Sequence, residues 1–419
     1  MGLQFIKNTN ETIFVQIAAY RDPELIPTLK DLFDKAHNPD NLKVVVAWQH
    51  DKNDEWDNLD EYQDDSRVKI LDIPHLDSEG ACWARHKIQQ EYSGEDYTLQ
   101  LDSHHRFVEG WDTKCISMLK KLQSEGHDKP LLTSYIPSYH PNNDPDGRVN
   151  TPWGMSFDRF IPEGVIFFLP YYLKEEPKPI PGRFYSAHFA FTLGKFCEEV
   201  PHDPSFYFHG EEITIAVRAF THGYDIFHPN EVLAWHEYTR EGRTKNWDDN
   251  QNWGEQNKIT HSKTRQLLGI DGEICTPCNK KAFGKYGLGD TRTLKDYEIY
   301  AGIRFSDRSI TKECKENTLP GVSNTPEYFQ QFKHAIDLNH NDYRLNDYTF
   351  CAFIFEDETG YNLHREDMEG PQFLSKVNSA REGNSFTIWK SYQGPKPDRI
   401  VVWPHSESKG WTEKRVMKL

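Results

Sequence analysis

An aspartate and a histidine two residues apart, Asp102 and His104, follow the short apolar run at residues 97–101. Extended backbone puts alternate side chains on the same side, so both groups face one point while Ser103 faces away. A carboxylate oxygen and an imidazole nitrogen together suit Mn²⁺ or a similar divalent ion. The same spacing also arises by coincidence at ordinary strand ends. The surrounding elements decide between these two interpretations.

A third metal ligand is expected at His236. It follows the apolar residues 233–235 and a Pro-Asn turn, so we expect it at the end of another strand. The chain has 19 histidines, and a single histidine is more often structural or solvent-exposed than a ligand. The presence of Asp102 and His104 favours the metal-binding interpretation.

The elements that would position these residues alternate between strand and helix through the first third of the chain. Helical spacing of apolar residues predicts helices over residues 24–36 and 80–92. Near-continuous apolar runs predict buried strands at residues 12–18, 42–49, 68–73 and 97–101. This order is typical of a doubly wound α/β sheet, which binds nucleotides beyond the carboxyl ends of its strands.

The rest of the chain divides into a loop-rich middle and a different C-terminal part. Residues 130–181 are rich in Pro, Asn and Asp, as in long loops that line or cover a site. Near the C-terminus, short strand-like runs alternate with turns. We therefore expect an α/β domain over residues 1–312 and a small β-rich accessory domain over residues 313–419.

The composition argues against some classes of partner. Acidic residues outnumber basic ones 65 to 49, and a net charge of −16 disfavours binding to nucleic acid or an anionic membrane. No apolar run of about 18 residues predicts a membrane span, and no secretory signal is recognised. The 7 cysteines are scattered, with Cys275 and Cys278 expected to be free thiols in a loop. That pattern favours a reducing compartment, so we expect a cytoplasmic protein.

Three motifs resemble one known family. Residues 17–25 (IAAYRDPEL), 100–112 (QLDSHHRFVEGWD) and 286–294 (YGLGDTRTL) look like the cytoplasmic polypeptide N-acetylglucosaminyltransferases that modify hydroxyproline. The polypeptide GalNAc-transferases are more distantly similar. The resemblance implies a GT-A fold, which is a Rossmann-like nucleotide-sugar transferase domain. It also implies UDP-GlcNAc as donor, Mn²⁺ or Mg²⁺ as cofactor, retention at the anomeric carbon, and a protein or glycan acceptor.

The resemblance further assigns roles to individual residues. It places the metal ligands at Asp102, His104 and His236. It places donor-binding groups at the first strand ends and in the following helix, at Arg21, Asp22, Gln49, Arg85 and Asp102. An acidic pair near the transferred sugar or acceptor, expected to be catalytic, corresponds to Glu211 and Glu212. Because adjacent helix residues face different directions, we expect only one of that pair to be functional.

Two further interpretations remain open. One is the same reaction with another donor, such as UDP-GalNAc, UDP-glucose or UDP-galactose. The other is a GT-A relic that binds glycans without catalysis, with sugars stacked on Trp389, Tyr392 and Trp403 of the C-terminal domain. The intact metal-ligand candidates argue against a relic. For an active enzyme we favour retention by same-face internal return over a carboxylate nucleophile, with the donor phosphate helping to deprotonate the acceptor.

Overall fold

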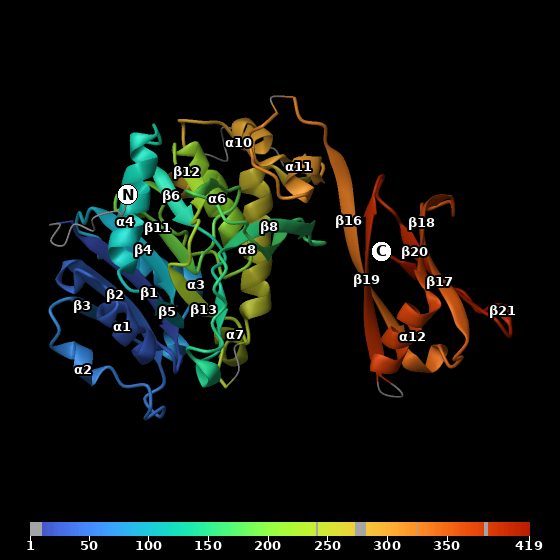
Figure 1. Ribbon diagram of the computed structural model, residues 1–419, viewed down its shortest axis with the longest axis horizontal. Helices are drawn as coiled ribbons and strands as arrows, with labels where there is room; N and C mark the ends of the chain where they lie inside the picture. The colour runs from blue at the N-terminus through green and yellow to red at the C-terminus, as the bar shows by residue number, and fades with distance from the viewer. Residues whose placement is uncertain (1–10, 240–241, 273–281, 324, 381–383) are drawn as a thin grey trace. The chain divides into compact units, whose positions relative to one another are not determined.

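The computed structural model describes residues 11–239, 242–272, 282–323, 325–380 and 384–419 (Figure 1). The chain forms two compact units. The first comprises the chain up to Ser306 together with Lys312–Pro326, and the second comprises Asp307–Thr311 and Glu327–Leu419. Each unit has a hydrophobic core of its own.

The first unit is built on an eight-stranded mixed sheet. Strands β1, β2, β3 and β4 run parallel to one another, and β11 runs antiparallel between β4 and β6. In spatial order the strands are β10 (Ile180–Pro181), β12 (Asp225–His228), β6 (Pro130–Thr133), β11 (Phe189–Leu193), β4 (Tyr97–Asp102), β1 (Ile13–Tyr20), β2 (Leu42–His50) and β3 (Val68–Pro74). The α/β sheet expected from the sequence is confirmed.

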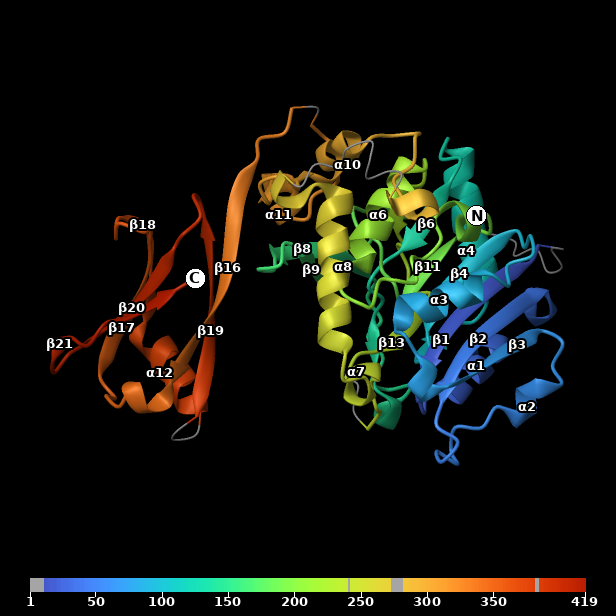
Figure 2. The ribbon, with the colours of Figure 1, turned by 180° about the vertical axis from the view of Figure 1, so that it is seen from behind.

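Helices cover both faces of this sheet. Helix α3 packs on one face, whereas α1 and α4 contribute to the core on the other, as the opposite views of Figures 1 and 2 show. The helices are α1 (Leu25–Asp34), α2 (Asp60–Gln63), α3 (Ala81–Gln89), α4 (Trp111–Ser124), α5 (Phe196–Glu199), α6 (Glu211–Thr221), α7 (Asn246–Asp249), α8 (Trp253–Leu268), α10 (Leu294–Ala301) and α11 (Lys312–Lys315). Short 3₁₀ turns lie at Pro39–Asn41, His75–Asp77, Pro141–Asn143, Ile270–Gly272 and Gly284–Tyr286. The helices predicted over 24–36 and 80–92 correspond to α1 and α3.

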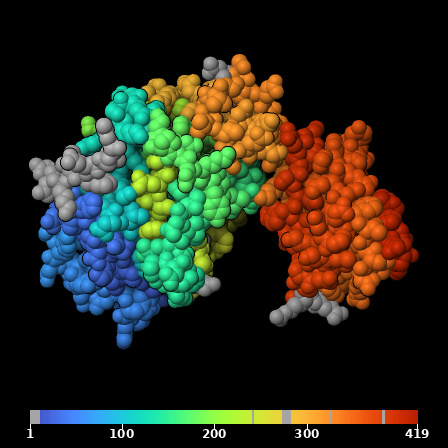
Figure 3. Space-filling view, viewed as in Figure 1, coloured from blue at the N-terminus to red at the C-terminus, as the bar shows by residue number. Residues whose placement is uncertain are grey.

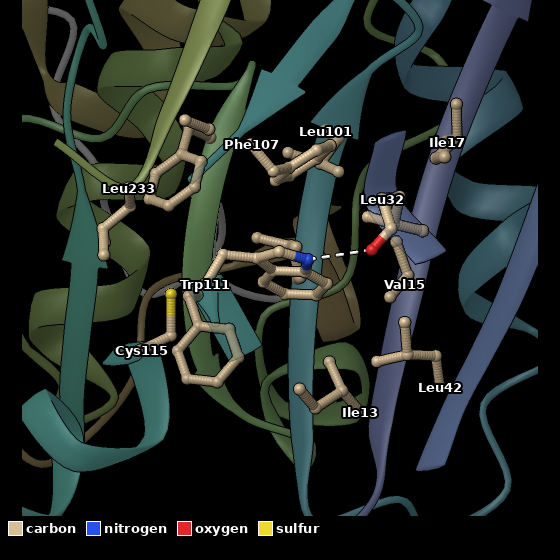
Figure 4. Packing of buried hydrophobic residues seen from close by; sticks show 14 of the residues in the cluster. Ile13, Val15, Ile17, Leu32, Leu42, Leu101, Phe107, Trp111, Cys115 and Leu233 are labelled. Atoms are coloured by element: carbon tan, nitrogen blue, oxygen red, sulfur yellow. Dashed lines mark hydrogen bonds between the residues drawn. The ribbon is translucent and has the colours of Figure 1, made fainter. Parts of the chain in front are cut away.

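Side chains of β1 alternate between two cores. Ile13 and Val15 face the larger core together with Trp111 of α4, whose indole Nε1 donates to the Leu32 carbonyl at 2.9 Å (Figure 4). Phe14 faces the opposite core, against α3. Because both faces of the strand are buried, its sequence is a nearly continuous apolar run, interrupted by the buried Gln16. Packing on both faces holds the carboxyl end of β1 in place.

Two smaller sheets complete the first unit. One joins β5 (His105–Phe107), β13 (Ala234–Glu237) and β7 (Ser138–Tyr139), and its register sets His236 opposite His105. The other is the hairpin of β8 (Trp153–Phe160) and β9 (Ile166–Tyr172). In the space-filling view of Figure 3, the residues of this part of the chain are coloured green and are seen on the near face. Residues 130–181, expected to be mainly loops, therefore contain a regular hairpin. The short strand β14 (Ile303–Arg304) follows α10.

The second unit is rich in strands, as expected for the C-terminal part. Its elements are β15 (Ser309–Ile310), β16 (Phe329–Asn339), a 3₁₀ turn (His340–Asp342), β17 (Tyr348–Glu356), β18 (Asn362–Glu369), α12 (Gly370–Ser379), β19 (Ser385–Gln393), β20 (Arg399–Ser406), β21 (Gly410–Trp411) and β22 (Arg415–Lys418). Tyr392 is buried in the core, which removes it from the sugar-stacking alternative. Trp389 is 49% exposed and Trp403 is partly exposed.

The described residues bear on a membrane span and on the cysteines. No helix among the described residues is both long enough and apolar enough to cross a bilayer. The five cysteines within the described parts are buried. Cys275 and Cys278 lie outside the described residues.

Candidate functional site

The carboxyl ends of β1, β2 and β4 meet at one edge of the sheet, because these strands are parallel. A cleft opens at this edge. Among the predicted site residues, those that line it are Asp22, Gln49, Arg85, Asp102 and His104. This is the position at which open α/β sheets bind ligands.

The three predicted metal ligands lie together beside this cleft. Atoms of Asp102, His104 and His236 suitable for ligation all lie within 4.8 Å of one another. Asp102 Oδ2 is 3.5 Å from His236 Nε2 and 3.8 Å from His104 Nε2. Asp102 and His104 come from the end of β4, whereas His236 is brought in by the pairing of β13 with β5.

The chemistry of this cluster fits a divalent ion. Both ring nitrogens of His236 are buried, and within the described residues neither has a hydrogen-bond partner. Burial and the neighbouring His104 lower the pKa of His236 well below its usual range, so the ring is neutral and can ligate. Burial alone would raise the pKa of Asp102, but contact with His236 and the charge of Arg85 hold it well below its usual range. One anionic oxygen and imidazole nitrogens form a donor set suited to Mn²⁺.

His104 is oriented by a carboxylate behind it. Asp22 Oδ2 lies 2.7 Å from His104 Nδ1 and accepts a 2.7 Å hydrogen bond from the Ser103 hydroxyl. Burial would raise the pKa of Asp22, but contact with His104 outweighs that effect and keeps it low. A carboxylate on one ring nitrogen leaves the other available to a metal, as in many histidine sites.

Arg85 links the cleft to the acidic pair of helix α6. Its guanidinium donates to Asp102 Oδ1 at 2.8 Å and also contacts Glu211, and the Arg85 side chain is only 4% exposed. Glu211 in turn accepts from the Cys82 thiol. Within the described residues, Arg85 is the cleft-lining side chain that contacts Glu211.

Glu212 points in another direction. It accepts hydrogen bonds from the Ala187 amide at 2.9 Å and the Tyr135 hydroxyl at 3.0 Å. Burial and the nearby charge of Glu211 raise the pKa of Glu212 to about 7. Neither Glu211 nor Glu212 lines the cleft, so the sequence-based expectation that one of them faces the sugar finds no support in this geometry.

Arg21 lies at the end of β1 but outside the cleft lining. Its backbone is in the left-handed region, with φ at 44°, which is uncommon for a residue other than glycine. Its guanidinium pairs with Asp54 at 2.8 Å and with Asp249 at 3.0 Å, and it lines an adjacent hollow with Trp56. Arg21 thus ties the segment containing α7 to the end of β1.

Gln49 belongs to a chain of hydrogen bonds along the same edge. Its amide donates to the Ala19 carbonyl at 3.0 Å, and its carbonyl accepts from Ser78 at 2.5 Å. Asn246 donates to Ser78 at 2.9 Å and accepts from the Tyr207 hydroxyl at 2.7 Å. These contacts fix polar groups around the cleft.

Sequence reasoning missed several lining residues. They are Tyr20, Ser78, Tyr207, Arg243, Asn246 and Trp247. Tyr20 stands within a quoted motif, so its position beside the strand end was a usable signal. Arg243 and Asn246 lie in a charged segment without strand or helix periodicity, where the sequence gives no direction for a side chain.

Comparison with known proteins shows the family to which the chain is similar. The model of the family Glycosyltransferase (GlcNAc) matches residues 12–66 and 55–307. No curated protein matches the chain.

Solved structures show weaker likenesses. GalNAc-T7, solved with UDP, GalNAc and Mn²⁺, is 16% identical with a TM-score of 0.47, and the match covers 68% of this chain. This chain spans 54% of that GalNAc-T7 chain. S. aureus TarS 1–349 in complex with UDP-GlcNAc is 8% identical with a TM-score of 0.35, over 66% of this chain and 78% of that chain.

The family match covers more than half of the chain and includes Asp102, His104 and His236. The expected α/β domain and the expected β-rich C-terminal strands are confirmed. The chain belongs to the Glycosyltransferase (GlcNAc) family.

Proposed function

We propose that this glycosyltransferase is metal-dependent and retaining, and that it moves GlcNAc from UDP-GlcNAc to a hydroxyl group. The observation that carries the proposal is the convergence of Asp102, His104 and His236 beside the strand-end cleft. Mn²⁺ or Mg²⁺ is the ion that we propose for this cluster.

The residues of the cleft suit departure of an anionic leaving group. A bound divalent ion would offset the charge that develops on the diphosphate as the sugar–phosphate bond breaks. Asp102 and the two histidines would hold that ion. Arg85 keeps Asp102 ionised and adds a positive charge to the cleft. We assign donor binding to Asp22, Gln49, Arg85 and Asp102, with Arg21 acting through the segment that it anchors.

The geometry supports retention without a protein nucleophile. Among the described residues that line the cleft, the carboxylates are Asp22 and Asp102. Asp22 is engaged with His104, and Asp102 belongs to the metal cluster. Because neither is left to attack the sugar, we favour same-face internal return, in which the departing phosphate helps to deprotonate the acceptor. The acidic pair then has indirect roles, Glu211 through Arg85 and Glu212 through Tyr135.

The acceptor that we propose is a hydroxyl of a protein or glycan, with protein hydroxyproline or Ser/Thr as candidates. A net charge of −16 disfavours a nucleic-acid partner. We further propose a cytoplasmic location, with residues 313–419 serving as an accessory domain.

Hydrolysis of UDP-sugars without acceptor tests the donor and the metal together. UDP release is measured from UDP-GlcNAc, UDP-GalNAc, UDP-glucose and UDP-galactose, with Mn²⁺ and with EDTA. Release from UDP-GlcNAc that requires Mn²⁺ supports the proposal. Metal-dependent release from another sugar reassigns the donor. Absence of both release and metal-dependent UDP binding would favour the glycan-binding relic.

A further inference from the structure

Arg243 lies against His104, one of the three proposed metal ligands. Its guanidinium lies 2.8 Å from Asp22 Oδ2 and 3.2 Å from Glu237 Oε2. It also contacts His104 Nδ1, and its Nη2 lies 3.3 Å from His104 Nε2. The Arg243 side chain is only 8% exposed, so it is seated in the protein and not extended into solvent.

This position conflicts with a metal ion on His104. A guanidinium is always charged and has only donors, so the Nη2 group that faces His104 Nε2 takes up the lone pair of that nitrogen. His104 Nε2, the nitrogen nearest Asp102, is the one that a metal ligated alongside Asp102 would use. A divalent cation there would also be repelled by the nearby positive charge. Arg243 and the ion therefore cannot both hold His104 in this arrangement.

We propose that Arg243 is a resident cation which the divalent ion must displace, so that metal and a nucleoside diphosphate bind cooperatively. The inference rests on the proposed metal site. Arg243 lines the cleft, where the oxygens of a diphosphate can replace Asp22 and Glu237 as its partners. It also lines the adjacent hollow beside Trp56, which gives the side chain room to move. By linkage, the factor by which the diphosphate tightens metal binding equals the factor by which the metal tightens diphosphate binding.

Lys245 provides a matched comparison. It lines the same cleft and carries the same charge, but it is 32% exposed and its ion-pair partner is Asp248, at 4.0 Å. Lys245→Gln therefore changes the net charge by the same amount as Arg243→Gln without removing a group from His104 or Asp22.

The test is titration of the whole protein with Mn²⁺, with free ion followed by electron paramagnetic resonance, in the presence and absence of UDP. In the wild type, UDP should tighten Mn²⁺ binding severalfold. Arg243→Gln should tighten Mn²⁺ binding without UDP by about tenfold and reduce the enhancement by UDP, within the usual range of coupling between sites. Lys245→Gln should leave Mn²⁺ binding without UDP near wild type.

Two results would overturn this inference and leave the proposed metal site standing. One is Mn²⁺ affinity in Arg243→Gln equal to that of the wild type. The other is an equal increase in Lys245→Gln, which would indicate general charge repulsion. A different result, no Mn²⁺ binding by wild type or variant even with UDP, would refute the proposed metal site and this inference with it. Circular dichroism of each variant checks that the fold is retained.

Discussion

Asp22 Oδ2 lies 2.7 Å from His104 Nδ1, so a residue just after β1 orients a residue just after β4. The two strands are neighbours in the sheet, with Ala18 opposite Asp102. The same parallel pairing that builds the sheet thus sets the tautomer of a proposed metal ligand.

Asp22→Asn should weaken Mn²⁺ binding about 10- to 100-fold. An amide no longer fixes the His104 tautomer in which Nε2 is unprotonated and able to ligate the ion. Calorimetric titration with Mn²⁺ in the presence of UDP measures this effect. Asp51→Asn is the control, since Asp51 contacts Arg21 at 3.7 Å and no metal candidate. Equal Mn²⁺ affinity in Asp22→Asn and wild type would rule out the orienting role.

His104→Ala should abolish metal-dependent UDP release while the protein stays folded. The side chain stands at the edge of the sheet, beside the cleft, and is no part of the hydrophobic core. Initial rates with saturating Mn²⁺ and a thermal melt give the two readouts. His127→Ala serves as the control, because His127 pairs with Asp225 and does not line the cleft. Full activity of His104→Ala would remove this residue from the site.

Arg85→Lys should lower kcat/KM for the donor by about tenfold or more. A lysine ammonium cannot reproduce the planar fork that bridges Asp102 and Glu211. If Glu211 acts through Arg85, the losses from Arg85→Lys and Glu211→Gln should not add, with a coupling of about 1–3 kcal/mol in a double-mutant cycle. Strict additivity would instead give Glu211 a role of its own.

Glu212→Gln should change how stability depends on pH. The folded state raises the pKa of Glu212 to about 7, above that of an unfolded glutamate near 4.3. Between these values the folded state binds more protons, so stability falls as pH rises through this window. Because glutamine has no proton to lose, the variant should gain stability relative to wild type from pH 5 to pH 8, on the order of 2 kcal/mol.

Urea unfolding at several pH values measures this gain. Glu231→Gln is the control, because Glu231 is a partly exposed glutamate paired with Lys114. Parallel pH profiles for wild type and Glu212→Gln would show that Glu212 is ionised in the folded protein at neutral pH.

Truncation tests the proposed role of the C-terminal part. A deletion that starts near residue 317 would remove the Thr318 carbonyl, to which Arg183 donates at 2.6 Å. A cut after Pro326 keeps that contact and the whole segment Lys312–Pro326. This truncation should reduce transfer to an acceptor more than donor hydrolysis. Equal loss of both activities would make the C-terminal part a structural support.

The sequence predicted those parts of the site that depend on local pattern. The apolar run was sufficient to place Asp102 and His104 at a strand end, and the prediction of another strand at His236 agrees with β13. The expectation that Ser103 faces away is wrong: the strand ends at Asp102, and Ser103 also lines the cleft and donates to Asp22. Pairing of β13 with β5 joins residues far apart in the chain, which periodicity cannot reveal. The direction of Glu211, Glu212 and Arg243 depends on side-chain partners from other elements, so the structure was needed to place them.

The central claim is tested most directly by diffraction from crystals grown with UDP and Mn²⁺, with anomalous data collected at the manganese edge. The account predicts one anomalous peak at the strand-end cleft, within about 2.5 Å of an Asp102 oxygen and of a nitrogen of both His104 and His236. UDP bound with no manganese at these three residues, or manganese held by another set of side chains, would contradict it.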